Sequence, residues 1–111
     1  MPRLLIDHMN LNKLMKQAQK MQEQMAKTQA ELEEKTVEVQ AAGGKITVVA
    51  NGAGEVLSIK IDKEIVDPND VEFLEEAVLS GVKGAIEQGK ALAQSEMTKI
   101  TGGLSMPGLG L

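Results

Sequence analysis

The sequence predicts an α+β fold: a long N-terminal helix, a three-stranded antiparallel meander and a long C-terminal helix, in a chain that forms a homodimer. Apolar residues recur every three or four positions before residue 35 and again after residue 70, which is the spacing of amphipathic helices. Between residues 36 and 61 they alternate every second position, which is the spacing of half-buried strands. Glycine-rich segments separate the alternating runs, and no internal repeat interrupts this order.

Composition limits the class of protein. The 111 residues suffice for one domain, and the single aromatic residue, Phe73, leaves the core to Val, Ile, Leu, Met and Ala. A domain of this size buries only about two-thirds of its unfolded surface, so an exposed helical seam indicates oligomerisation. The absence of cysteine excludes disulfides, thiolate metal sites and cysteine nucleophiles. No apolar run approaches the ~20 residues of a membrane span, and the first ten residues lack a signal-peptide pattern, so we predict a cytoplasmic protein without a membrane partner.

The first helix is predicted from about Asn10 to Glu34, a segment rich in Ala, Gln, Lys, Met and Glu, all of which favour helices. Apolar or small residues recur there with heptad spacing, which is typical of a seam between two helices. The seam consists of Leu11, Leu14, Ala18, Met21, Met25, Thr28 and Leu32. A polar helix with one narrow apolar stripe cannot bury that stripe alone, so the seam predicts an obligate dimer.

Three strands are predicted next, joined by short turns. Their expected order is a strand containing Val37 and Val39, a two-residue turn at Gly43-Gly44, a strand at Ile46–Val49, a turn at Asn51–Gly54, and a strand at Val56–Ile61. The last strand places Leu57, Ile59 and Ile61 on one face. The single apolar face of such a meander needs a cover, which we expect the second helix to supply.

The second helix is predicted to begin at Asp67, as N-cap, with Pro68 in the first helical position. Asp70 would favour the positive end of the helix dipole, and Val66 would pack on Val71 as a hydrophobic staple. The helix should run to about Thr101, where Gly102-Gly103 would end it. Residues 104–111 are expected to form a flexible tail.

Several segments of the chain resemble one protein family. They are the run MNLNKLMKQAQKMQ at 9–22, the run VVANG at 48–52 leading into VLSIKID at 56–62, and the closing KITGGL at 99–104 with Pro107-Gly108. Together they resemble the YbaB/EbfC family of bacterial nucleoid-associated proteins, over Met9 to Leu109. The resemblance implies a family domain at residues 9–103, preceded by an N-terminal extension at residues 1–8. It also implies a small homodimer whose long helices project like tweezers from a central sheet, and which binds double-stranded DNA in the nucleoid with little sequence preference.

The first helix carries a row of lysines. With Leu11 at heptad position a, Lys13, Lys20 and Lys27 fall at c and Lys16 at f, so the row lies away from the seam and extends for about 20 Å. Lysines without interleaved arginines or aromatics suit contacts with phosphates and offer little reading of bases. The alternative, that they merely keep an exposed helix solvated, stays open.

Charge is distributed unevenly along the chain. Residues 1–30 carry five basic and two acidic side chains, a net charge of +3, whereas the remainder carries seven basic and fourteen acidic ones, a net charge of −7. The overall charge of −4 and the pI near 5.0 predict weak, salt-sensitive DNA binding, with the acidic Glu72, Glu75 and Glu76 facing away from the duplex. Lys83 and Lys90 recur on the outer face of the second helix as a possible further DNA contact, although pairing with Glu87 is the favoured interpretation.

Signatures of catalysis are weak. The segment 84–91 matches G-x-x-x-x-G-K but ends in Ala91 where a phosphate-binding loop needs Ser or Thr, and it lies within a helical period. His8, the sole histidine, has no neighbouring ligand or nucleophile, and capping explains Asp67 and Asp70 better than a metal loop does. We therefore predict no enzymatic activity, no cofactor, no metal and no small-molecule substrate.

Three glycines interrupt the second helical pattern, at Gly81, Gly84 and Gly89. Each costs about 1 kcal/mol relative to alanine inside a helix, which favours a close approach of the sheet or of a partner helix at these positions.

Two functions remain open at this point. The first is a non-enzymatic DNA-binding protein that uses the lysine row. The second is a protein-interaction adaptor that uses the helical seam or the methionine-rich surface, with DNA binding incidental.

Overall fold

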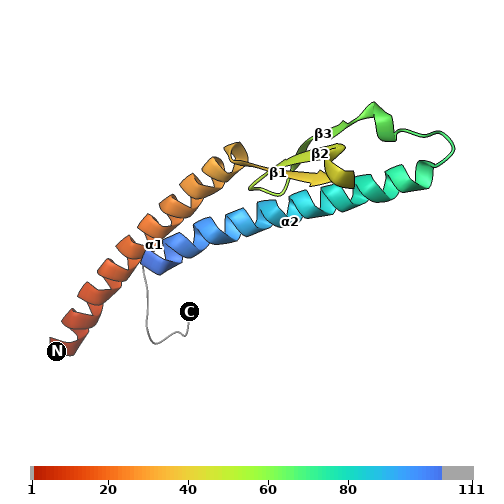
Figure 1. Cartoon of the computed structure of the whole chain (residues 1–111). Coiled ribbons are helices and arrows are strands. Elements are labelled where there is room, and N and C mark those ends of the chain that lie inside the picture. Colours follow the sequence, from red (N-terminus) through yellow and green to blue (C-terminus); the bar gives the residue numbers. More distant parts are fainter. Residues whose placement is uncertain (1, 104–111) are drawn as a thin grey trace.

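The computed structural model describes residues 2–103; the predicted tail at 104–111 lies outside them. The main elements are α1 (Pro2–Glu34), β1 (Thr36–Ala41), β2 (Ile46–Asn51), β3 (Val56–Ile61) and α2 (Val71–Gly103). Short 3-10 helices, which the sequence did not predict, follow β1 at Ala42–Gly44 and β3 at Lys63–Ile65. The sheet lies along α2, and α1 projects from one end as an arm, so that the molecule measures 82 × 26 × 17 Å (Figure 1). The predicted α+β order is confirmed.

The sheet is an antiparallel meander with β2 in the centre. Val48 of β2 pairs with Val39 of β1 on one side and with Ile59 of β3 on the other. A bulge interrupts the second pairing, because Val49 faces Ser58 whereas the next residue, Ala50, faces Val56. The intervening Leu57 therefore has no partner of its own across the strands.

The predicted two-residue hairpin at Gly43-Gly44 is wrong. Ala41 pairs with Ile46, so four residues connect the strands. Ala42, Gly43 and Gly44 all adopt positive φ angles of 52°, 63° and 89°, of which only the glycines are free of a Cβ penalty. The Lys45 amide closes the turn on the Ala42 carbonyl at 3.2 Å.

The predicted start of α2 is also wrong, by about one turn. Asp67 forms a separate turn, in which its carboxylate accepts from the Asn69 amide at 2.9 Å and its carbonyl accepts from the Asp70 amide at 3.0 Å. Asp70 is the N-cap, since its Oδ1 accepts from the Phe73 amide at 3.3 Å. Val66 and Val71, the expected hydrophobic staple, are each about half exposed, so this staple does not bury them. At the other end the helix includes Gly102 and Gly103, within the usual variation of helix boundaries.

The core lies between α2 and the first two strands. Ile46, Val48 and Ala50 of β2 and Ala85 of α2 are fully buried. The helix glycines make this contact possible. A Cβ on Gly81 would lie 2.9 Å from Val48 Cγ2, and one on Gly89 would collide with the Asn51 carbonyl oxygen. The glycines therefore serve a close approach of the sheet, as the sequence suggested.

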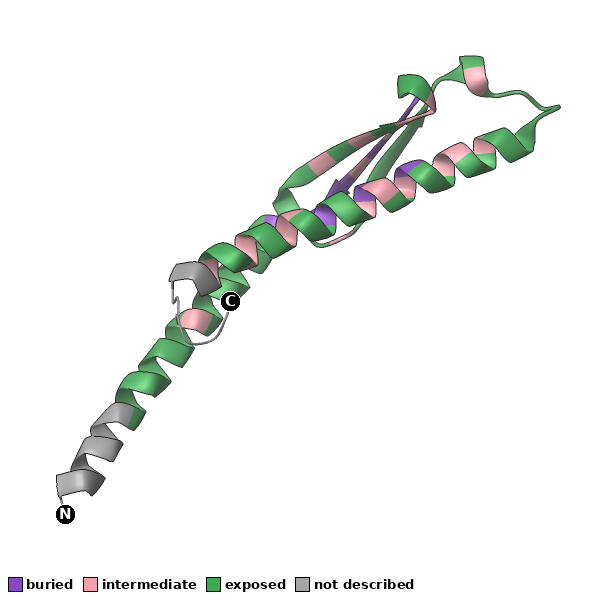
Figure 2. Ribbon diagram, turned by 60° about the horizontal axis from the view of Figure 1, so that its bottom comes forward, coloured by how far each residue is buried: buried purple, intermediate pink, exposed green. Residues whose placement is uncertain are grey.

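The cover over the sheet is incomplete, contrary to expectation. All of β3 is exposed, with Leu57, Ile59 and Ile61 at 53%, 42% and 40% (Figure 2). Ile59 and Ile61 pair with the buried Val48 and Ile46, so they share the face on which α2 lies. A helix about 10 Å wide covers roughly two strands spaced about 4.8 Å apart, and here it covers β1 and β2.

Candidate nucleic-acid interface

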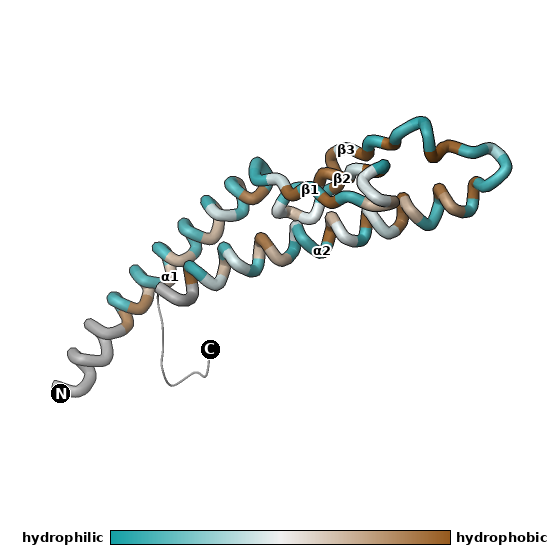
Figure 3. The backbone as a smooth tube through the Cα atoms, in the orientation of Figure 1, coloured by the Kyte–Doolittle hydropathy of each residue, from teal (hydrophilic) through white to brown (hydrophobic). Residues whose placement is uncertain are grey.

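The arm formed by α1 leaves the body of the molecule over most of its described length. All side chains from 11 to 20 are exposed, Met21 and Thr28 are half-buried, and Leu32 is buried within its own chain at 3% exposure. Figure 3 shows hydrophilic and apolar positions alternating along this helix.

The predicted seam is thus divided. Its C-terminal end serves packing within the chain, through Leu32, which corrects the expectation that the whole stripe meets a partner. The free part includes Leu11 at 53%, Leu14 at 59% and Met25 at 39% exposure, together with the exposed Ala18.

The lysine row is solvent-exposed on this arm. Lys13, Lys16, Lys20 and Lys27 are exposed, and none of them forms an ion pair with a carboxylate of the described residues. Lys20 and Lys27 border one shallow hollow with Glu23 and Gln24. The four ammonium groups are available to an anionic ligand.

The structure adds a lysine that sequence reasoning missed. Lys27 borders a second hollow, between the helices, that Lys99 and Ile100 of α2 also line. Lys99 is 71% exposed at its side chain, so a fifth lysine lies beside the row, in a hollow that Glu31 and Glu96 also line. No local pattern could have revealed this, because the two lysines meet only through the packing of helices distant in sequence.

A small ion-pair cluster lies beside this hollow. Glu96 Oε1 is 3.1 Å from Lys35 Nζ and 3.5 Å from Lys99 Nζ. The hydrogen bond from Lys35 lowers the pKa of Glu96 below its usual value, with help from the charges of both lysines. The cluster joins the start of β1 to α2 at the base of the arm.

Lys83 and Lys90 are not brought to the arm by any described contact. Both are exposed on α2, and the ion pairs with Glu87 that the sequence favoured do not form among the described residues. The G-x-x-x-x-G-K segment that includes Lys90 is helical throughout, so its N–H groups are committed to helix hydrogen bonds.

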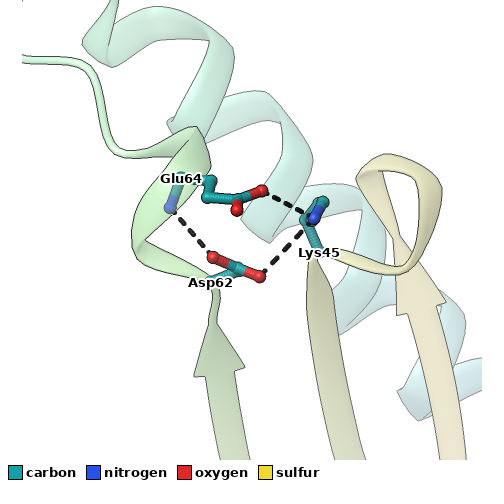
Figure 4. Close-up of polar contacts among 3 residues, drawn as sticks. All are labelled: Lys45, Asp62 and Glu64. Carbon is teal, nitrogen blue, oxygen red and sulfur yellow. Dashed lines mark hydrogen bonds and ion pairs between the residues drawn. The ribbon is translucent and has the colours of Figure 1, made fainter.

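The end of the molecule opposite the arm is acidic. There Lys45 Nζ lies 2.8 Å from Glu64 Oε2 and 3.6 Å from Asp62 Oδ2, which joins the start of β2 to the segment after β3 (Figure 4). The hydrogen bond to Glu64 and the charge of Asp62 raise the pKa of Lys45. The exposed Glu72, Glu75 and Glu76 lie in the first turns of α2 at this same end. The acidic end carries a net negative charge, whereas residues 11–28 of the arm carry four lysines and one glutamate.

Other kinds of site find no support in the part of the chain that the structure describes. No group of three or more acidic or histidine side chains there could hold a metal ion. Across the same residues, no helix is both long enough and apolar enough to cross a membrane.

Comparison with known proteins places the chain in a family. The model of the YbaB/EbfC DNA-binding family matches residues 8–104. A nucleoid-associated protein of Clostridium novyi is 52% identical over 101 residues, covering 91% of this chain and 89% of the relative. One of Ruminiclostridium cellulolyticum is 54% identical over 101 residues, covering 90% and 88%. The crystal structure of an uncharacterized Helicobacter pylori protein, HP0035, shares the fold with a TM-score of 0.60 and 17% identity, over 70% of this chain and 90% of that one. The chain belongs to the YbaB/EbfC DNA-binding family.

Proposed function

We propose that this protein is a non-enzymatic, homodimeric nucleoid protein that binds double-stranded DNA with little sequence preference through the lysines of α1. The observation that carries the proposal is an exposed lysine row on a projecting arm, without an ion pair among the described residues, in a chain of a DNA-binding family. The names of its relatives support a location at the nucleoid.

The mechanism is electrostatic. Each ammonium group replaces condensed counterions at a phosphate, and the release of those ions drives binding. Lysine is a point charge without the planar fork of arginine, and residues 11–34 contain neither arginine nor an aromatic side chain to read or stack on bases. The binding energy is consequently almost independent of sequence.

We propose that the two copies meet along the uncovered face of β3. One stripe of α2 contains Leu79, Val82, Ile86 and Gly89, which follow one another at intervals of three or four residues. A Cβ on Gly89 would contact the turn between β2 and β3, so this stripe forms the flank of α2 nearest to β3. With Leu57, Ile59 and Ile61 it forms an apolar surface with a strand half and a helix half, called here the β3 surface. Such a surface is self-complementary about a two-fold axis, because the helix half of each copy can cover the strand half of the other.

The test of function removes the arm charges. Changing Lys13, Lys16, Lys20 and Lys27 to Gln keeps helix propensity while deleting four charges per copy. We expect affinity to fall on unrelated duplexes alike, with a shallower dependence on salt and an unchanged mass in light scattering. The matched control changes Lys60 and Lys63, exposed lysines towards the acidic end, to Gln and should bind as the parent does.

The adaptor function has one observation in its favour, the free apolar stripe of the arm at Leu11, Leu14 and Met15. DNA binding by the arm variant equal to that of the parent would reject the proposed mechanism. Lys83 and Lys90, or the adaptor function, would then be preferred.

A further inference from the structure

We infer that Asn51, the last residue of β2, and Gly52, the first residue of the turn to β3, are positioning residues for DNA binding that fix the direction of the α1 arm. The role in DNA binding rests on the proposed function, whereas the effect on the arm can be measured without DNA. The two residues, called here the arm latch, join the last turn of α1 to the sheet.

Asn51 is buried, at 3% exposure, and both the nitrogen and the oxygen of its side-chain amide are fully hydrogen-bonded. Its Nδ2 donates to the Glu33 carbonyl at 3.2 Å and to Glu55 Oε1 at 3.1 Å. Its Oδ1 accepts from the amides of Ala53 at 3.0 Å and Glu55 at 2.9 Å. One side chain therefore holds the shape of the turn and binds the arm to it.

Gly52 completes the contact through its backbone. Its amide donates to the carbonyls of Leu32 at 2.8 Å and Lys35 at 3.0 Å. The Leu32 and Glu33 carbonyls belong to the last turn of α1, where no intrahelical donor is available, so the latch acts as a C-terminal cap supplied from the sheet. A Cβ on Gly52 would lie 2.5 Å from Leu32 Cδ2, which shows how closely the turn approaches the helix.

The base of the arm also packs against α2, through side chains that are less buried than the latch. The ion pair between Lys35 and Glu96 is exposed on the lysine side, at 45%, and such pairs contribute little. Met21 and Thr28 are only half-buried. Within residues 11–34 of α1, Leu32 alone is buried, and it lies directly on the latch.

A small change at the base is amplified along the arm. At 1.5 Å per residue, Lys13 lies about 30 Å from the end of α1, so a tilt of about 10° moves it by about 5 Å. Successive phosphates of one DNA strand are spaced by about 3.4 Å along the axis. A loosened latch would therefore shift the lysine row out of register with the phosphates while leaving its charge intact.

The experiment measures the arm directly. The chain has no cysteine, so Gln19→Cys on α1 and Ser80→Cys on α2 can be spin-labelled, and the labelled chain is diluted with unlabelled parent so that the distance between the labels is measured within one copy. Asn51→Asp keeps the size of the side chain but removes both donors to Glu33 and Glu55. We expect it to broaden the distance distribution and weaken DNA binding about tenfold. Asn69→Asp, which adds the same charge in an exposed turn, is the control and should change neither.

A milder variant covers the case in which Asn51→Asp does not fold. Glu55→Ala removes an exposed partner of the Asn51 amide and should broaden the distribution to a smaller extent. A distance distribution like that of the parent, in Asn51→Asp or in Glu55→Ala if the former is unfolded, would overturn the inference. Broadening of the arm with unchanged DNA affinity would overturn the role in binding. Failure of the proposed function would instead appear as full binding by the arm lysine variant.

Discussion

At the scale of single residues, the glycines of α2 differ in the atoms that an added Cβ would contact. A Cβ on Gly89 would strike the backbone oxygen of Asn51, whereas one on Gly84 would lie 3.1 Å from Val39 Cγ1, a methyl group that can move. Backbone cannot yield as a side chain does, so the two positions should respond differently to the same substitution.

Gly89→Ala should lower the free energy of unfolding by about 2 kcal/mol, because overpacking against the sheet outweighs the gain in helix propensity of about 1 kcal/mol. Gly84→Ala serves as the comparison and should be close to neutral. Urea unfolding followed by circular dichroism measures both. Equal shifts of the two midpoints would contradict this account of the glycines.

The ion pairs of Glu96 lead to a prediction about the stability of the fold at acidic pH. Its pKa is lower in the folded chain than its ordinary value of 4.5, chiefly because Lys35 donates a hydrogen bond to it. The stabilisation is therefore present above the unfolded pKa and is lost as the pH falls through the folded one. Glu96→Gln should flatten the loss of stability below about pH 4.5, while Glu87→Gln, which lacks a described ion pair, should follow the parent. Thermal unfolding over a pH series measures the difference; parallel curves for Glu96→Gln and the parent would refute it.

At the scale of elements, local sequence patterns predict where the strands and helices lie, but they do not predict which of their faces become buried. Val56–Ile61 was predicted as a strand with one apolar face, and that strand is confirmed. That the face stays open depends on where α2 lies across the sheet, which periodicity within β3 cannot indicate. The turn between β1 and β2 and the start of α2 differ from the predictions because glycine and aspartate each permit several turn types. The strand register selects the first, and the hydrogen bond to Asp70 selects the second.

The β3 surface makes a prediction about assembly. Ile59→Glu should convert the dimer to a monomer, because it would bury a charge without a partner in an apolar contact. Ser58→Glu places the same charge on the opposite face of the same strand and should leave the mass unchanged. Light scattering at micromolar concentration distinguishes the two. A dimer with Ile59→Glu would exclude the β3 surface as the interface and direct attention to the free stripe at Leu11 and Leu14.

At the scale of the whole molecule, the separation of charge reconciles an acidic protein with a DNA-binding family. The arm carries the lysine row, and the acidic first turns of α2 lie at the opposite end. A duplex on residues 11–28 of the arm meets four lysines and one glutamate locally, while the net charge of the chain remains −4. Salt should screen this local attraction readily.

The salt dependence of DNA binding can test whether Lys99 contributes to the contact beside the arm lysines. The four arm lysines of each of two copies would engage at most about eight phosphates, so the slope of log K against log salt should be no steeper than about −7. With Lys99 of both copies included, the limit becomes about −9. Lys99→Gln should therefore make the measured slope shallower by up to about two. Lys90→Gln, on a part of α2 away from the arm, should leave the slope as it was. A slope unaffected by Lys99→Gln would confine the DNA contact to α1.

The sequence by itself determined the two long helices, the three strands, their order and the candidate lysines of α1, because each depends on neighbours within a few residues. Helical spacing predicted α1 and α2, alternation predicted the strands, and the heptad placed Lys13, Lys20 and Lys27 on one side of the arm. The tertiary structure decided what no local pattern contains. The packing of α1 against α2 brings Lys99 to Lys27, the position of α2 leaves β3 uncovered, and the turn at Asn51 and Gly52 caps a helix that ends about seventeen residues earlier. Contacts between segments distant in sequence depend on the geometry of the folded chain, and so they appear only once that geometry is known.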